Sequence, residues 1–371
     1  MMFMYVLAAV NLAMAIGIAA GFARKAPIRR EAKIVCYAVV AVLYIMSVSY
    51  MPLRRGGYFS GYLEDIFASS VAIIFIFFIA VLIGDWIVRA LKNPRSKNIA
   101  RLSIPIAAIV YLSYGFFSAF TAPNVKRVFV EMDGIVKPVT IAHLTDLHLG
   151  NGKLLNERFA KNIADQVNDL RPDMVVITGD LIDAPIARVE TALAEIAKIQ
   201  SKYGIFFATG NHEYFYNPDE AFERLEQLGV ITLRNDSRVI SGEFGEIAIA
   251  GVYDLVGRRY GRLKPDPKKA LENIPAETPT IALAHQPKAA FEFKPNSFDL
   301  MFAGHTHGGQ MFPFTIFVAF AQPYVAGLYT RDGDDRGKIY VSRGVGYWGP
   351  PFRMFAPNEI ALIALLPKEN V

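Results

Sequence analysis

Four uncharged apolar stretches in the first third of the chain constrain its fold more than any other feature. Each lacks Asp, Glu, Lys and Arg over 19 to 24 residues, and they comprise residues 1–23, 34–53, 66–84 and 102–125. At about 1.5 Å per residue, each stretch as a helix could cross the roughly 30 Å hydrocarbon core of a bilayer. Helices buried in a large soluble core are the alternative, but four such stretches separated by short basic loops favour membrane spans.

The balance of charge divides the chain after these stretches. Residues 1–121 contain 12 Lys and Arg against 4 Asp and Glu, whereas residues 122–371 contain 27 against 30. We therefore expect a transmembrane region of four helices at 1–121 and a separate domain at 122–371. The basic residues belong to the membrane loops and do not indicate nucleic-acid binding, and no nucleotide-binding fingerprint stands out. The single cysteine, Cys36, excludes an intramolecular disulfide and a cysteine metal site.

The loop charges also predict which side of the membrane the second domain occupies. The loops after the first and third stretches carry five Lys and Arg each, whereas the loop between the second and third has only Arg54 and Arg55, offset by Glu64 and Asp65. Because cytoplasmic loops are enriched in Lys and Arg, the two richer loops are expected in the cytoplasm. Four spans then place the second domain outside it. If one stretch lay in the membrane interface, the domain would face the cytoplasm.

The second domain shows an α/β pattern. Short β-branched runs such as "MVVITGD" alternate with amphipathic stretches such as "NERFAKNIADQVNDLRPD", in which Phe159, Ile163 and Val167 have helical spacing. Each of the chain's six histidines lies at or just after the end of a strand-like run: His143, His148, His212, His285, His305 and His307. Asp146, Asp180 and Asn211 occupy equivalent positions. Open α/β sheets place their ligand sites at the carboxyl ends of strands, so these residues predict a functional site.

The spacing of these residues suits metal binding. Asp146 and His148 are two residues apart, as are His305 and His307, and residues i and i+2 of an extended segment point to the same side. Nitrogen and oxygen donors without sulfur favour Mn, Fe, Co, Ni or Zn. One ion needs fewer ligands than this set supplies, so two ions bridged by a carboxylate are expected, an arrangement typical of phosphoester hydrolysis.

Five short motifs resemble the blocks of the calcineurin-like metallophosphoesterases, in the same order. They are "DLHLG", "GD" at 179–180, "GNHE" at 210–213, "AHQP" at 284–287 and "GHTHGGQ" at 304–310. The resemblance covers residues 140 to about 350 and extends to a bacterial membrane-associated branch. It implies an α/β fold, the metallophosphoesterase two-sheet (αββα) sandwich, here preceded by the four transmembrane helices. We expect the chain to be a multi-pass protein located in the bacterial inner membrane.

The resemblance also implies a role for each candidate residue. One divalent metal ion would be held by Asp146, His148, Asp180 and His307. The other would be held by Asp180, Asn211, His285 and His305, with Asp180 bridging and with Mn, Fe or Zn as the candidate metals. A hydroxide activated by the two metals would attack phosphorus, and His212 would stabilise the phosphate and protonate the leaving oxygen. His143 lies outside the blocks and is expected to be a strand residue rather than a partner of the ligands.

The expected activity is hydrolysis of a phosphodiester or pyrophosphate bond in a lipid-linked substrate, with membrane lipids as partners. UDP-2,3-diacylglucosamine, the pyrophosphate substrate in lipid A synthesis, is one alternative, but it is cytoplasmic and conflicts with the sidedness that the loop charges predict. A soluble nucleotide substrate is another. A membrane sensor or transport protein with an inactive esterase-like domain is a third, and the complete ligand set argues against it.

Two segments leave alternatives open. Residues 311–329 are apolar, but Pro313 and Pro323 make a fifth membrane span improbable, so the segment is either buried core or a surface that touches lipid beside the site. The Gly- and Pro-rich segment near the C-terminus either lines the substrate site or forms a packed loop; its candidate residues are Arg343, Tyr347, Trp348 and Arg353.

Overall fold

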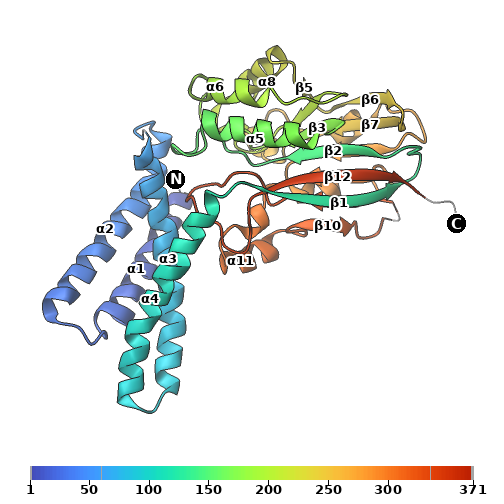
Figure 1. Ribbon diagram of the computed structural model, residues 1–371. Helices are drawn as coiled ribbons and strands as arrows, with labels where there is room; N and C mark the ends of the chain where they lie inside the picture. The colour runs from blue at the N-terminus through green and yellow to red at the C-terminus, as the bar shows by residue number, and fades with distance from the viewer. Residues whose placement is uncertain (1, 60, 335, 369–371) are drawn as a thin grey trace. The chain divides into compact units, whose positions relative to one another are not determined.

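The chain forms two compact units in the computed structural model, which describes residues 2–59, 61–334 and 336–368 (Figure 1). The first unit comprises Met1–Phe120 and Gly349–Met354. The second comprises Thr121–Trp348 and Phe355–Val371.

The first unit contains four long helices, as expected from the apolar stretches. They are α1 (Met2–Ile18), which continues as the π-helical turn η1 (Ala19–Ala23), α2 (Arg30–Arg55), α3 (Tyr62–Ala90) and α4 (Pro94–Ala119). Among the described residues, all four are long and apolar enough to cross a membrane, which confirms the prediction of four candidate spans. The fourth helix begins before its uncharged stretch, at Pro94, and ends before the stretch does, at Ala119, because the first strand of the next unit already begins at Asn124.

Helix α3 lies against the other three helices, and its buried residues include the small side chains of Ala68, Ser70 and Ala72. Small residues let helix backbones approach closely in a bilayer, where packing replaces the hydrophobic effect. The ammonium group of Lys25, in the loop after η1, lies 2.7 Å from a carboxylate oxygen of Asp85 on α3. This ion pair links the loop to the end of α3.

The segment Gly349–Met354 packs on α4. The ring of Phe352 occupies the position that a side chain at Gly115 would fill, and it lies 5.3 Å from the ring of Phe116 in an edge-to-face arrangement. The backbone N–H of Arg353 donates a hydrogen bond to the carbonyl oxygen of Gly115 at 2.9 Å. A segment that lies between two strands of the second unit in the chain is therefore part of the first unit.

The second unit contains two six-stranded sheets. In spatial order, the first is β1 (Asn124–Met132), β12 (Glu359–Pro367), β2 (Val139–Leu144), β3 (Met174–Thr178), β4 (Ile205–Ala208) and β5 (Ile231–Thr232). The second is β10 (Gly327–Thr330), β11 (Lys338–Val341), β9 (Leu300–Ala303), β8 (Thr280–Leu283), β7 (Gly245–Gly251) and β6 (Asp236–Gly242). The last strand, β12, lies between β1 and β2, parallel to the former and antiparallel to the latter (Figure 1).

Helices cover the outer faces of both sheets. The first sheet carries α5 (Glu157–Leu170), α6 (Ile186–Ile196) and α8 (Pro218–Gln227), preceded by the short α7 (Glu213–Tyr216). The part of the chain that forms the second sheet contains the short helices α9 (Gly257–Tyr260), α10 (Pro267–Leu271), η2 (Pro287–Glu292) and η3 (His307–Gly309). One apolar cluster fills the space between the sheets, and two others lie under the outer helices. This is the expected αββα sandwich.

Period-2 alternation in β2 shows how the sequence builds these layers. Ile141 belongs to the cluster between the sheets, whereas its neighbours Ala142 and Leu144 belong to the cluster beneath the helices. Both faces of the strand are buried, which is why it reads as a nearly continuous apolar run. Helix α5 packs on the outer face of the sheet with an apolar stripe that includes Ile163 and Val167.

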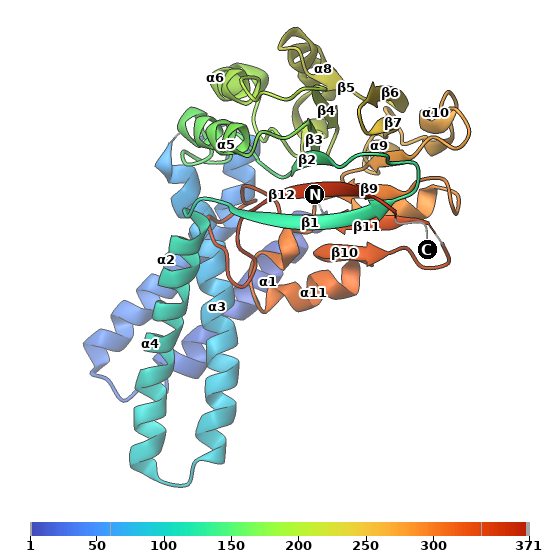
Figure 2. The same ribbon diagram turned by 45° about the vertical axis from the view of Figure 1, so that its right-hand side comes forward.

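The apolar segment 311–329 contains α11 (Phe314–Ala321), bounded by Pro313 and Pro323. No residue of this helix is buried. For this helix, the alternative that placed the segment in the buried core is therefore wrong, since the helix lies at the surface of the second unit. Met311 and Tyr324, on either side of the helix, are buried. Figure 2 shows α11 beyond β10, which is the edge strand of the second sheet.

Candidate metal centre

The eight predicted site residues meet at one end of the sandwich, each in a loop that follows a strand. Three parallel strands of the first sheet lead to Asp146 and His148 after β2, Asp180 after β3, and Asn211 and His212 after β4. Two parallel strands of the second sheet lead to His285 after β8, and to His305 and His307 after β9. The carboxyl ends of parallel strands share an edge, so residues far apart in the sequence come together there.

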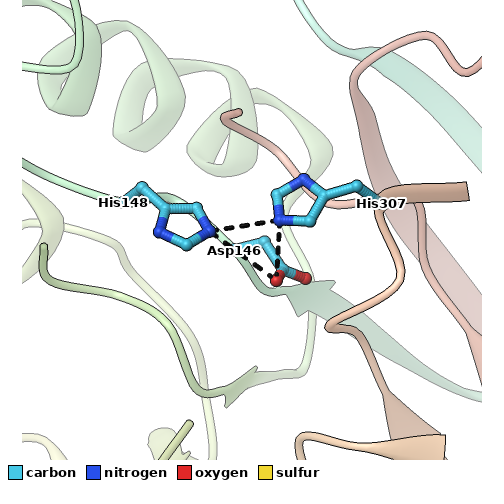
Figure 3. A group of neighbouring side chains, drawn as sticks. All are labelled: Asp146, His148 and His307. Atoms are coloured by element: carbon cyan, nitrogen blue, oxygen red, sulfur yellow. Dashed lines mark hydrogen bonds and ion pairs between the residues drawn. The ribbon is translucent and has the colours of Figure 1, made fainter. Parts of the chain in front are cut away.

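One group of ligands consists of Asp146, His148 and His307, all buried (Figure 3). The Nε2 atoms of His148 and His307 lie 3.1 Å apart, and His307 Nε2 lies 3.1 Å from Asp146 Oδ1. Figure 3 shows the two rings and the carboxylate pointing toward one another.

A second group consists of Asp180, His285 and His305. His285 Nε2 lies 3.1 Å from Asp180 Oδ2 and 3.3 Å from His305 Nδ1. Asp180 Oδ2 is also 3.8 Å from His148 Nε2 of the first group. The carboxylate of Asp180 thus lies between the two groups, as a bridging ligand would.

The donor atoms fit divalent cations. Within each group, two imidazole nitrogens face each other at hydrogen-bond distance, an arrangement that a cation between them satisfies. Asn211 Oδ1 is buried and accepts no hydrogen bond within the described part of the chain. Because buried polar atoms in proteins are nearly always paired, an unpaired amide oxygen at this place suits a metal ligand.

Five of these residues adopt a left-handed backbone. The φ angles are 56° at Asp146, 48° at His148, 49° at Asp180, 67° at His305 and 51° at His307. Non-glycine residues rarely adopt this conformation, and each such residue costs on the order of 1–3 kcal/mol. Such strain concentrates at functional sites, where the surrounding structure holds it. Here the backbone N–H of His305 donates to Asp146 Oδ2 at 3.0 Å and ties the two groups' loops together.

Close approach requires glycine at two positions. A Cβ atom on Gly304 would overlap the side chains of Thr145 and Asp146, and one on Gly210 would overlap the carboxylate of Asp180. Both ligands therefore lie directly against a neighbouring backbone, which explains the glycines of the "GH" and "GN" motifs.

The carboxylates are held as anions. Burial would raise the pKa of Asp146, but attraction to His307 and the other imidazoles lowers it well below its usual range. The pKa of Asp180 is lowered in the same way, mainly by His285. In turn the pKa of His285 rises well above its usual value, because attraction to Asp180 outweighs burial. Burial and repulsion from His285 lower the pKa of His305 to about 3 and keep it neutral, as a metal ligand must be.

Asp183 is a site residue that sequence reasoning missed. Its buried carboxylate lies 2.8 Å from His212 Nδ1 and 3.3 Å from His148 Nδ1. It therefore orients one predicted ligand and the predicted catalytic histidine at once. The only signal in the sequence was its position three residues after Asp180 in "GDLID".

Glu213 was given no role from the sequence, and the structure shows one. Its fully buried carboxylate accepts four backbone hydrogen bonds, from Asp180 at 3.1 Å, Leu181 at 2.8 Å, Ile182 at 3.2 Å and Gly210 at 2.7 Å. These donors belong to the loops after β3 and β4, so Glu213 joins the two loops that carry Asp180 and Asn211. Burial, followed by repulsion from Asp180, raises the pKa of Glu213 to about 7.

The remaining candidates lie elsewhere. His143 is a strand residue, with Nε2 2.7 Å from Thr178 Oγ1 and its ring against Phe302. Of the Gly- and Pro-rich segment, only Trp348 lines the site. Arg343 is paired with Glu359 at 2.8 Å, while Tyr347 is packed in the second unit and Arg353 in the first.

The centre opens into a cavity of about 280 Å³. It is lined by His212 and five of the metal-ligand candidates, and also by Phe314, Val318 and Ala321 of α11. The cavity therefore combines polar and charged side chains that can bind a phosphate with apolar side chains that can contact an apolar group esterified to it.

Comparison with known proteins gives a consistent result. The family model described as calcineurin-like phosphoesterase matches residues 139–309. An uncharacterized metallophosphoesterase of Helicobacter pylori is 40% identical over 275 residues, which are 74% of this chain and 72% of that protein. One from Campylobacter jejuni is 35% identical over 340 residues, 89% of each chain. A transmembrane protein with metallophosphoesterase domain from Danio rerio is 35% identical over 276 residues, 71% of this chain and 62% of that protein.

Proposed function

Since the chain belongs to the calcineurin-like metallophosphoesterase family, we propose that it hydrolyses a phosphodiester or pyrophosphate bond of a lipid-linked substrate at the membrane. The observation that carries this proposal is the convergence of two Asp–His–His groups around the shared carboxylate of Asp180, at the floor of a cavity with an apolar wall.

The chain's own side chains would divide the work as follows. Asp146, His148 and His307 would hold one ion, and Asp180, Asn211, His285 and His305 would hold the other, with Asp180 placed to serve both. When bound, two divalent ions supply a Lewis acid for the phosphoryl oxygen and a hydroxide nucleophile at neutral pH.

His212 is placed to act on the leaving oxygen. It lines the cavity, Asp183 lies at its Nδ1 side, and its Nε2 lies on the side of the metal-ligand candidates, 3.8 Å from Asp180 Oδ2. A carboxylate at Nδ1 stabilises the imidazolium form and fixes the orientation of the ring. An imidazolium held in this way can donate its Nε2 proton as the leaving alkoxide forms.

Two features support a lipid-linked substrate. The same chain contains four candidate membrane spans, so the enzyme and a lipid would share one membrane. Part of the lining of the cavity is apolar and comes from Phe314, Val318 and Ala321 of α11. UDP-2,3-diacylglucosamine belongs to this substrate class, but its use requires a domain that faces the cytoplasm, opposite to the side that the loop charges predict. The complete donor set argues against an inactive esterase-like domain.

The test is metal content and hydrolysis of bis(p-nitrophenyl) phosphate by the full chain in detergent, compared with Asp180→Asn and with Asp299→Asn. Asp299 is also a buried aspartate, but it pairs with Arg336 away from the site. We expect about two metal ions per chain and turnover in the parent and in Asp299→Asn, with both lost in Asp180→Asn. Absence of metal after equilibration with Mn²⁺, Fe²⁺ or Zn²⁺ would refute the proposal.

A further inference from the structure

Helix α11 is apolar on both of its faces. Phe314, Val318 and Ala321 follow one another at spacings of four and three residues and face the cavity. The opposite face carries Ile316, Phe317 and Phe320, whose exposed fractions are 48%, 59% and 89%. A helix that is hydrophobic all round is normally enclosed by protein or lipid, yet no residue of α11 is buried.

The exposed face continues into a larger patch. Phe312, at the entry to the helix, lies with its ring 5.7 Å from that of Phe355, and these rings are 42% and 75% exposed. We define the α11 surface by its five exposed side chains: Phe312, Ile316, Phe317, Phe320 and Phe355. The segment 300–330 around it has no Asp, Glu, Lys or Arg. A contiguous apolar patch of this kind marks a site of interaction with an apolar partner.

Chain connectivity indicates which apolar partner is available. Only residues 120–123 join α4, a candidate membrane span, to β1. Fully extended, the backbone from Ala119 to Asn124 covers about 18 Å. A second connection is shorter, because Trp348 lines the cavity and the next residue begins the segment Gly349–Met354 that packs on α4. Both connections tie the second unit to a candidate membrane span.

We propose that the α11 surface inserts into the interface of the lipid bilayer. Helix α11 then separates the lipid from the metal centre, with Phe317 and Phe320 among the acyl chains and Phe314 and Val318 toward the cavity. Burial of aromatic and aliphatic side chains at the headgroup boundary removes their area from water. The segment 300–330 contains no Asp, Glu, Lys or Arg whose desolvation would oppose this burial.

The inference also deepens the proposed function. If the site cleaves a lipid-linked phosphoester, the acyl chains of the substrate remain in the bilayer beside α11 while the phosphate reaches the metal ligands past this helix. That part rests on the proposed function, whereas the insertion of α11 does not.

The insertion is tested with a nitroxide spin label on the full chain in phosphatidylcholine–phosphatidylglycerol nanodiscs, in a Cys36→Ser background. Labels are placed at Phe320→Cys, at Val239→Cys, and at Ile106→Cys on the exposed side of α4. Val239 is 38% exposed and lies on β6, at the opposite edge of the second sheet from β10. Collision with oxygen, which concentrates in lipid, is compared with collision with a water-soluble nickel chelate.

We expect position 320 to collide mainly with oxygen, as position 106 does, and position 239 to collide mainly with the chelate. A label at 320 that meets the chelate as readily as position 239 would overturn the proposal. A label at 320 that meets neither reagent would also overturn it, because a second copy or another protein would then cover the helix. No hydrolysis is needed for this measurement, so an inactive protein would refute the proposed function and leave the insertion standing.

The substrate role is tested by the double substitution Phe317→Asp and Phe320→Asp, with Val239→Asp as the matched control. We expect the ratio of kcat/KM for a fluorescent phospholipid diester in the nanodisc to that for bis(p-nitrophenyl) phosphate to fall at least about tenfold in the double variant, because carboxylates are costly in the bilayer. The ratio in the control is expected to stay unchanged. An unchanged ratio in the double variant would exclude a role of α11 in lipid access.

Discussion

Substitution of Glu213 by Gln tests whether one buried carboxylate organises the metal-binding loops. The glutamine side chain has the same shape, but one of its oxygens is replaced by an NH₂ group. In either orientation this NH₂ faces two backbone N–H groups, those of Asp180 and Gly210 or those of Leu181 and Ile182. Two buried donors then lose their acceptor.

The size of the effect follows from these contacts. A buried donor left without its acceptor costs about 1–3 kcal/mol, so two cost about 2–6 kcal/mol, of a total stability that is typically 5–15 kcal/mol. Because the pKa of Glu213 is about 7, the carboxylate form dominates at pH 8, where the comparison is cleanest. For a domain of this size, a loss of about 3 kcal/mol lowers the midpoint of thermal unfolding by roughly 6–12 °C.

The assay is thermal unfolding of the full chain in detergent at pH 8, followed by near-ultraviolet circular dichroism, together with a titration of metal affinity. Since the loops that carry Asp180 and Asn211 lose their common support, we expect metal affinity to fall by about 10- to 100-fold. Glu190→Gln is the control: Glu190 is paired with Arg224 at the surface, and its loss is worth about 1 kcal/mol or less. A Glu213→Gln variant that melts within about 2 °C of the parent and binds metal equally well would refute the reasoning.

Three further outcomes are expected. Asp183→Asn should lower kcat by about 10²-fold or more for an alkyl phosphodiester and far less for a p-nitrophenyl ester. The reason is that the alkoxide is a poor leaving group and needs the proton from His212, whereas p-nitrophenolate leaves without it. Equal losses of kcat with both substrates would contradict this role of Asp183. Removal of metal by a chelator should lower the midpoint of thermal unfolding by several degrees. A free metal concentration of about 100 times the Kd stabilises the folded state by about 2.7 kcal/mol. Scanning calorimetry with and without Mn²⁺ measures the change in the midpoint. In a Cys36→Ser background, a membrane-impermeant maleimide should label Lys268→Cys but not Lys92→Cys in intact spheroplasts, and the reverse pattern would place the second unit in the cytoplasm.

Much of the site could be predicted because its ligands follow their strands immediately. Asp146 and His148, and likewise His305 and His307, are local pairs whose spacing is visible in the sequence. Parallel strands then bring the pairs to a common edge, whatever the details of packing. The four candidate spans were visible for a similar reason, since length and apolar composition are properties of each segment alone.

The supporting residues could not be predicted, because their roles depend on partners that are distant in the sequence. Asp183 acts through two histidines, one 35 residues before it and one 29 after it, and Glu213 through N–H groups of the preceding loop. Likewise, nothing local indicated that β12 would lie between β1 and β2. Side-chain types report burial and charge, but they do not report which distant group will lie opposite them.

By itself, the sequence determined four candidate spans, an α/β pattern, and a set of nitrogen and oxygen donors at strand ends, and its resemblance to a family implied the two-sheet sandwich and a bridging Asp180. Only the tertiary structure decided that Asp183 and Glu213 support the ligands, that Gly349–Met354 packs on α4, and that α11 has one face on the cavity and the other exposed. The physical reason is that hydrophobic periodicity depends on near neighbours in the chain. Contacts between distant segments are selected by the packing of the whole unit, and an apolar helix has the same composition whether protein or lipid covers it.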